Sequence, residues 1–156
     1  MSEKNEFYKL DNINRKIINI LLKNARTPYS DIAKTVGLKS PSVIERIKHL
    51  EKEKIIKGYS IDIDYQRIGY DIIALIGLII NDSALEEAFK NKILDFDDDI
   101  VECYEVSGNF TLIIKVITKN TQTLSKLLSK LKKEPGFQET HTIIVFKVVC
   151  DKKHPV

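Results

Sequence analysis

The spacing of apolar residues predicts helices at the beginning of the chain and strands further along. Apolar side chains recur every three or four residues behind Asp11, a residue type that caps helix N-termini, and this pattern ends at about Lys23. Further on, Ile61 and Ile63 alternate with aspartates, which predicts a strand over residues 59–65. The periodicity therefore changes from helical to extended after the first 58 residues.

Two helices joined by a tight turn are predicted between residues 25 and 50. Thr27 and Pro28 supply an N-cap oxygen and a first helical residue for the shorter helix, and Gly37 ends it. Ser40 and Pro41 repeat this signal and open the next helix. Three helices followed by a strand are typical of a winged helix-turn-helix domain.

The remaining residues alternate between strand and helix patterns. Strands are predicted at 72–80, 101–106, 112–118 and 140–149, Ser83 is the expected N-cap of one helix, and Thr121 opens another. The order βαββαβ is that of a ferredoxin-like sandwich. The expected fold class is α+β, with a winged helix-turn-helix domain in residues 1–58, a linker strand and hinge in 59–70, and a ferredoxin-like domain in 71–156.

The first strand of this second half is apolar on both faces. Its alternate residues Ile72 and Ile76 on one side, and Ile73 and Leu75 on the other, are all apolar. Two helices cover only one face of a four-stranded sheet, and a large exposed apolar face is rare on a monomer. The pattern therefore predicts self-association through the open face of the sheet.

Charge is distributed unevenly along the chain. Residues 1–60 hold 13 Lys and Arg against 7 Asp and Glu, a net charge of +6, while residues 61–156 hold 12 against 15, a net charge of −3. This asymmetry suggests a polyanion as the partner of the first half. The longest apolar run is too short to cross a bilayer, so a cytoplasmic protein without membrane contact is expected.

Motifs for catalysis or for a cofactor are missing from the sequence. It has no glycine-rich phosphate loop, no Ser-His-Asp or Cys-His spacing and no HExxH motif. The two cysteines, Cys103 and Cys150, lie far apart and are expected to be free thiols. The aspartates at 95–99 lack the spacing of a calcium loop and indicate a solvated turn. We therefore expect a protein that is not an enzyme and holds neither a metal nor a cofactor.

Double-stranded DNA is the partner that the third helix suggests. Val43, Ile47 and Leu50 give it one apolar side, and the side chains opposite are of types that hydrogen-bond base edges or phosphates. The candidate DNA-binding residues are Arg26, Lys39, Ser40, Ser42, Glu45, Arg46, Lys48 and His49. The competing interpretation is a merely solvated face, with Arg46 paired to Glu45, Asp31 or a helix end.

Several short segments together make the chain similar to the Lrp/AsnC (leucine-responsive regulatory protein, feast/famine) family. They are Leu10-Asp11, Ala25-Arg26, Ile32-Ala33, Val36-Gly37-Leu38, Val43, Arg46, Leu50-Glu51, residues 56–59, Gly69-Tyr70, Gly108, Thr140, Thr142 and Val145. The resemblance implies a transcriptional regulator that binds pseudo-palindromic operators as a homodimer or an octamer. It also implies that the second domain binds an amino-acid-like effector and carries the oligomer contacts.

Three positions depart from the family pattern. Lys39 replaces a serine that usually caps the recognition helix, so the cap is expected at Ser40 and the helix a residue later. Lys54 replaces a glycine, which implies a left-handed residue at a cost of about 1 kcal/mol, or a different exit. Thr111 stands where amino-acid-responsive members usually carry an acidic residue.

The effector site and the function leave alternatives open. Ser107, Gly108, Asn109, Thr111, Thr140 and Thr142 are the candidate effector-binding residues, and the alternative is that they only form turns and strands. Two rival functions are an architectural protein that coats DNA and a siroheme-decarboxylase-like enzyme on the same fold. Such an enzyme needs basic and histidine residues in a tetrapyrrole pocket, for which His141 and Arg67 are the candidates.

Overall fold

A computed structural model of the chain divides into two compact units, whose described parts are residues 8–62 and 63–150. Residues 1–7 and 151–156, and the side chains of Leu94 and Gln138, lie outside the description. The division between the units falls inside the predicted hinge at 59–70. No helix among the described residues is long and apolar enough to span a bilayer.

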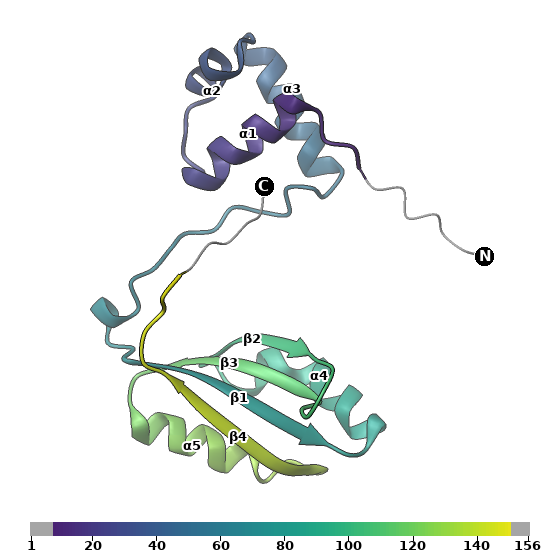
Figure 1. Cartoon of the computed structure of the whole chain (residues 1–156), viewed down its shortest axis with the longest axis vertical. Coiled ribbons are helices and arrows are strands. Elements are labelled where there is room, and N and C mark those ends of the chain that lie inside the picture. The colour runs from purple at the N-terminus through teal and green to yellow at the C-terminus, as the bar shows by residue number, and fades with distance from the viewer. Residues whose placement is uncertain (1–7, 151–156) are drawn as a thin grey trace, which may run out of the picture. The chain divides into compact units, whose positions relative to one another are not determined.

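Unit 1 consists of the three predicted helices (Figure 1). They are α1 (Asn12–Lys23), α2 (Tyr29–Val36) and α3 (Ser40–Lys52). Each places its apolar side toward the other two, as helical periodicity requires. The resulting small core contains Ile17, Leu21, Ile32, Ala33, Val43 and Ile47.

Only one of the three helix caps in this unit is the predicted one. The Asp11 carboxylate accepts a hydrogen bond from the Asn14 backbone N–H, as expected. Thr27 does not cap α2, because its hydroxyl donates to the carbonyl of Asn24 in the preceding connection. The cap shift to Ser40 is also wrong. Lys39 is the N-cap of α3 and makes no side-chain cap bond.

Pro41 explains why α3 begins one residue earlier than predicted. The first N–H groups of a helix have no intrahelical acceptor, so a proline is tolerated anywhere in that turn and does not have to come first. At the other end Lys54 has a φ of 56°, which confirms the left-handed exit on a residue other than glycine. Gly37 ends α2 with a φ of 73°, also as predicted.

The strand predicted at residues 59–65 is wrong. Residues 57–64 have no secondary structure, and a turn at Tyr65 leads into a single turn of 3-10 helix, η1 (Gln66–Ile68). A strand exists only where a neighbouring strand accepts its backbone hydrogen bonds, and none of the described strands pairs with this segment. Ile61 is consequently 80% exposed, and unit 1 carries no wing strand among its described residues.

Unit 2 has the predicted βαββαβ order (Figure 1). The sheet is antiparallel throughout, with the strand order β2-β3-β1-β4, and two helices pack on one face. The elements are β1 (Ile72–Ile80), α4 (Ser83–Phe96), β2 (Ile100–Glu105), β3 (Leu112–Thr118), α5 (Thr121–Leu131) and β4 (Phe137–Val145).

Three boundaries in unit 2 differ from the prediction, and the smallest difference is at β2, which covers Ile100–Glu105 where residues 101–106 were expected. β4 begins at Phe137 and ends at Val145, whereas residues 140–149 were expected, because β1 offers it partners only from Ile80 back to Ile73. Helix α4 is capped by Asp82 and not by Ser83, since the Asp82 carboxylate accepts from two backbone N–H groups of the first turn. A carboxylate there also complements the positive end of the helix dipole.

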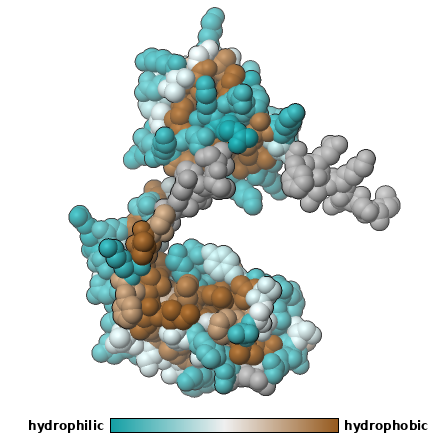
Figure 2. All heavy atoms as spheres, in the orientation of Figure 1, coloured by the Kyte–Doolittle hydropathy of each residue, from teal (hydrophilic) through white to brown (hydrophobic). Residues whose placement is uncertain are grey.

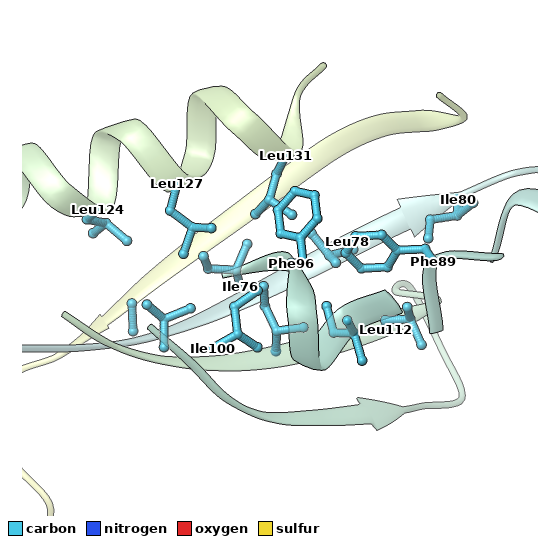
Figure 3. Packing of buried hydrophobic residues seen from close by; sticks show 14 residues of the cluster. Ile76, Leu78, Ile80, Phe89, Phe96, Ile100, Leu112, Leu124, Leu127 and Leu131 are labelled. Carbon is cyan, nitrogen blue, oxygen red and sulfur yellow. The ribbon is translucent and has the colours of Figure 1, made fainter. Parts of the chain in front are cut away.

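The core of unit 2 lies between the sheet and the two helices (Figure 3). Alternate residues of β1 and β3 point into it, and the helices contribute leucines and phenylalanines from one side each. Figure 3 shows Phe96 of α4 next to Leu131 of α5, and Phe89 of α4 next to Leu78 of β1. The two phenylalanine rings meet edge to face with centroids 5.4 Å apart, a favoured arrangement for aromatic pairs.

Neither helix of unit 2, as far as its residues are described, packs on the other face of the sheet. Figure 2 shows apolar side chains gathered over the strands of unit 2, and Ile73, Leu75 and Ile113 remain partly exposed. Phe110, from the connection between β2 and β3, folds back over Gly77 in the middle of β1. A Cβ atom added at Gly77 would lie 2.7 Å from the Phe110 ring. Glycine is therefore needed there for close approach of the ring and not for its backbone angles.

Replacement of Gly77 by alanine should displace the Phe110 ring and destabilise unit 2. We expect a loss of about 1–3 kcal/mol, the usual cost of overpacking a filled site. Chemical denaturation of the full chain followed by circular dichroism measures this loss. Gly58→Ala is the matched control, because a Cβ at Gly58 meets nothing within 4 Å. Equal stability of the two variants would contradict the close packing of Phe110.

Candidate DNA-binding and effector sites

Helix α3 exposes one continuous polar face. Val43, Ile47 and Leu50 are buried on its inner side. The face turned away from the core carries four of the predicted DNA-binding residues, all exposed, namely Ser42, Glu45, Lys48 and His49. With hydroxyl, carboxylate, ammonium and imidazole groups in a row, this face offers both donors and acceptors for base edges.

Arg46 does not lie on this face. Its guanidinium turns toward α1, where Nη1 lies 2.6 Å from the Asp11 carboxylate and 2.9 Å from the side-chain oxygen of Asn14. Of the two interpretations of Arg46 offered by the sequence, the structure supports pairing with a helix end. The N–H of Asn14, followed by the Arg46 guanidinium, lowers the pKa of the Asp11 carboxyl from its ordinary value.

The other candidate DNA-binding residues surround the exposed face of α3. Lys39 and Ser40 lie at its N-terminus, and Arg26 is exposed in the connection between α1 and α2. Neither α2 nor α3 has a side chain capping its first N–H groups, whereas Asp11 caps α1. Free N–H groups at a helix N-terminus favour phosphate oxygens.

Two contacts of α3 were missed from the sequence. The Tyr8 and His49 rings lie 5.9 Å apart, so the segment before α1 touches the recognition helix. The Tyr59 hydroxyl donates to the Glu51 carboxylate at 2.8 Å and ties the beginning of the linker to the end of α3. Burial, together with the Glu51 carboxylate, raises the pKa of Tyr59 to about 12, so the tyrosine stays a donor at neutral pH. The periodicity of the sequence does not predict such contacts, because they join residues on different elements.

The predicted effector residues lie on two segments of unit 2, on opposite sides of β1. Ser107, Gly108 and Asn109 are exposed in the connection between β2 and β3. The Thr111 hydroxyl is occupied by the backbone of Ile80, from whose N–H it accepts at 3.0 Å. Thr140 and Thr142 lie on β4, beyond the opposite edge of β1, paired with Leu78 and Ile76.

A shallow depression of about 530 Å³ lies at the beginning of β4. Thr140 is among its lining residues, together with Lys132, Phe137, Glu139 and His141. His141 Nε2 lies 3.0 Å from the Glu139 carboxylate, and its ring is 5.3 Å from that of Phe110. The depression thus combines both signs of charge with an aromatic wall, a composition suited to a small zwitterion.

Helix α3 and its exposed polar face, in a three-helix unit that a βαββαβ unit follows along the chain, define a DNA-binding regulator of the helix-turn-helix class. Residues 10–51 match the model of the AsnC-type helix-turn-helix domain, and residues 73–155 match the Lrp/AsnC ligand binding domain. The HTH-type transcriptional regulator FL11 of Pyrococcus furiosus is 34% identical over 89% of this chain and 91% of its own length. The chain belongs to the Lrp/AsnC family of transcriptional regulators.

Solved structures agree with this assignment. The structure of AsnC from Escherichia coli superposes with a TM-score of 0.86 at 29% identity, over 94% of this chain and 99% of that one. A feast or famine regulatory protein of M. tuberculosis, complexed with L-methionine, has a TM-score of 0.86 at 21% identity, over 94% and 98% of the two chains. The latter match shows the common fold.

The Asp11 carboxyl should titrate below the ordinary range for aspartate, and Arg46→Met should raise its pKa only part of the way back, because the Asn14 N–H remains. Since the pKa is lower in the folded protein, this group stabilises unit 1 above the pKa of the unfolded chain, about 3.9. That contribution is lost as pH falls through the folded pKa. Carbon-detected NMR titration of both proteins measures the shift, and an ordinary Asp11 pKa in the parent protein would refute the ion pair.

Proposed function

We propose that the protein is a cytoplasmic homo-oligomeric regulator that reads a pseudo-palindromic operator with one α3 helix per subunit. The observation that carries this proposal is the exposed polar face of α3, built from Ser42, Glu45, Lys48 and His49, with Arg46 turned away from it. The names of the relatives support a regulatory and not an enzymatic role. Two recognition helices related by a twofold axis would enter successive major grooves, about one helical turn apart.

The chemistry of this face assigns different tasks to its residues. Glu45 is suited to accept from a cytosine amino group, while Ser42 and His49 are suited to either bases or phosphates. Arg26, Lys39 and the uncapped N-termini of α2 and α3 are suited to phosphates, which fix the register without reading sequence. The net charge of +6 on residues 1–60 supplies the general attraction to DNA.

Selection of sites from random duplex DNA should return a pseudo-palindromic motif. In competition at physiological salt, Glu45→Gln should relax the preference at one position of each half-site, with a loss of about 1–3 kcal/mol of discrimination. Lys39→Gln should weaken binding to the selected and to the scrambled duplex by the same factor, and should lower the slope of binding against salt concentration by about one. A featureless selected pool would point to an architectural DNA-coating protein.

The open face of the sheet supports self-association. β1 is apolar on this side at Ile73, Leu75 and Ile79, and β4 adds Ile143, which is 56% exposed. Helices α4 and α5 occupy the opposite face, so neither of them covers these residues. A second copy presenting the same face would bury them and would pair two recognition helices.

Analytical ultracentrifugation at micromolar concentration should show a species larger than the 17.9 kDa chain. Leu75→Glu should shift it toward the monomer, because a carboxylate at the centre of an apolar interface remains unpaired. Ser125→Glu, on the exposed side of α5, adds the same charge elsewhere and should leave the species unchanged. A parent protein that sediments only as a monomer would rule out this interface.

An amino-acid-like effector is the ligand that the second unit supports. Residues 73–155 match the Lrp/AsnC ligand binding domain, and a structural neighbour holds L-methionine. Thr111 provides no carboxylate for an ammonium group, whereas Glu139 does. Lys132 lines the same depression, and its ammonium group suits a ligand carboxylate. We therefore place the charged recognition at the beginning of β4 and not at the Ser107–Thr111 connection.

Thermal shift with the common amino acids, each at millimolar concentration, tests the effector. A ligand at 100 times its dissociation constant should stabilise the protein by about 2.7 kcal/mol and raise its melting temperature. Glu139→Gln should reduce the shift, while Asn109→Ala should leave it unchanged if the connection takes no part. The absence of a shift with every amino acid would exclude this ligand class.

A further inference from the structure

The contacts around Arg46 join the first turn of α1 to the middle of α3. Asn14 is only 6% exposed. Among the described residues, the only other buried polar side chain is that of Thr118, which belongs to unit 2. A buried amide oxygen without a partner destabilises a protein, and here the partner is the Arg46 guanidinium. Asp11 neutralises the charge that Arg46 brings to this site.

This cluster fixes the rotation of α3 about its own axis. The apolar residues of α3 pack through rounded side chains, which tolerate small rotations, whereas hydrogen bonds of 2.6 and 2.9 Å do not. Arg46 and His49 are neighbours at i and i+3, and the second of them touches Tyr8. Two consecutive turns of the recognition helix are therefore held by residues 8–14.

We propose that Arg46 is a positioning residue and that Asp11 and Asn14, which belong to the beginning of α1 and not to the exposed face of α3, determine how sharply α3 discriminates between sequences. The inference rests on the proposed function of α3 as the DNA reader. A helix whose rotation is fixed presents Ser42 and Glu45 to the groove at one angle. Loss of the fixed angle reduces binding to the correct sequence more than binding to a random one, because only base contacts depend on that angle.

The expectation differs from that for a direct DNA contact. If Arg46 bound a phosphate or a base, its pairing with Asp11 would compete with DNA, and removal of the Asp11 charge would strengthen binding or leave it unchanged. If Arg46 positions α3, removal of the Asp11 charge weakens discrimination, as removal of Arg46 itself does. Asp11→Asn isolates the charge, because asparagine is as good an N-cap as aspartate.

The experiment compares the full-length protein with Asp11→Asn, Arg46→Met and the double variant, in binding to the selected duplex and to a scrambled one. We expect each single variant to lower the ratio of the two affinities about tenfold, and the double variant to lower it no further, because both remove one coupled interaction. Asp31→Asn is the matched control. It removes the carboxylate of an exposed ion pair with Lys34 in the same unit and changes the charge by the same amount.

Two results together would overturn the proposal in favour of a direct contact. Asp11→Asn would leave the ratio of the two affinities unchanged or raise it, and Arg46→Met would lower the salt slope of DNA binding by about one. Circular dichroism establishes that each variant is folded, and Arg46→Lys replaces Arg46→Met if the latter is not. Amide hydrogen exchange of the free protein gives a readout without DNA. Faster exchange along α3 in Asp11→Asn but not in Asp31→Asn supports the positioning role of Arg46. Equal exchange rates in the two variants overturn it. This readout holds even if the parent protein selects no DNA sequence and the proposed function itself fails.

Discussion

Strand β1 lies between β3 and β4 and carries apolar residues on both faces, while the two helices of unit 2 cover only one of them. The packing of the second unit depends on this difference between the covered and the open face of the sheet. The leucines and phenylalanines of α4 and α5 pack on the covered face, and Phe110 packs over Gly77 on the open face. What Phe110 leaves uncovered is the apolar surface that we assign to a second copy of the chain.

Self-association and DNA reading are linked by this arrangement. Helix α3 alone carries acidic and basic residues in similar number, so a single copy would bind DNA weakly. In the proposed dimer, affinity and specificity come from presenting two such helices at once. Within each helix the polar residues divide into two groups, because Arg46 faces α1 while Ser42, Glu45, Lys48 and His49 face outward. In our proposal, Arg46 on the inward side fixes the orientation in which the outward residues are presented.

In our proposal, the second unit recognises a charged ligand at a different place from the family pattern. Thr111 has no carboxylate, and its hydroxyl is already used by the backbone of β1. Glu139, Lys132 and His141 bring charge to the beginning of β4 instead, on a strand at the edge of the sheet. A site on an edge strand is also well placed to respond to contacts between subunits.

The sequence by itself determined the helices of unit 1, the βαββαβ order of unit 2 and the two free cysteines, because these follow from periodicity and from the spacing of thiols. It also indicated the left-handed Lys54. Only the tertiary structure decided that Arg46 pairs with Asp11, that Thr111 is occupied and that residues 59–65 form no strand in a single chain. Each of these depends on a partner distant in sequence, and local patterns of apolar and polar residues contain no information about which distant group will accept a hydrogen bond.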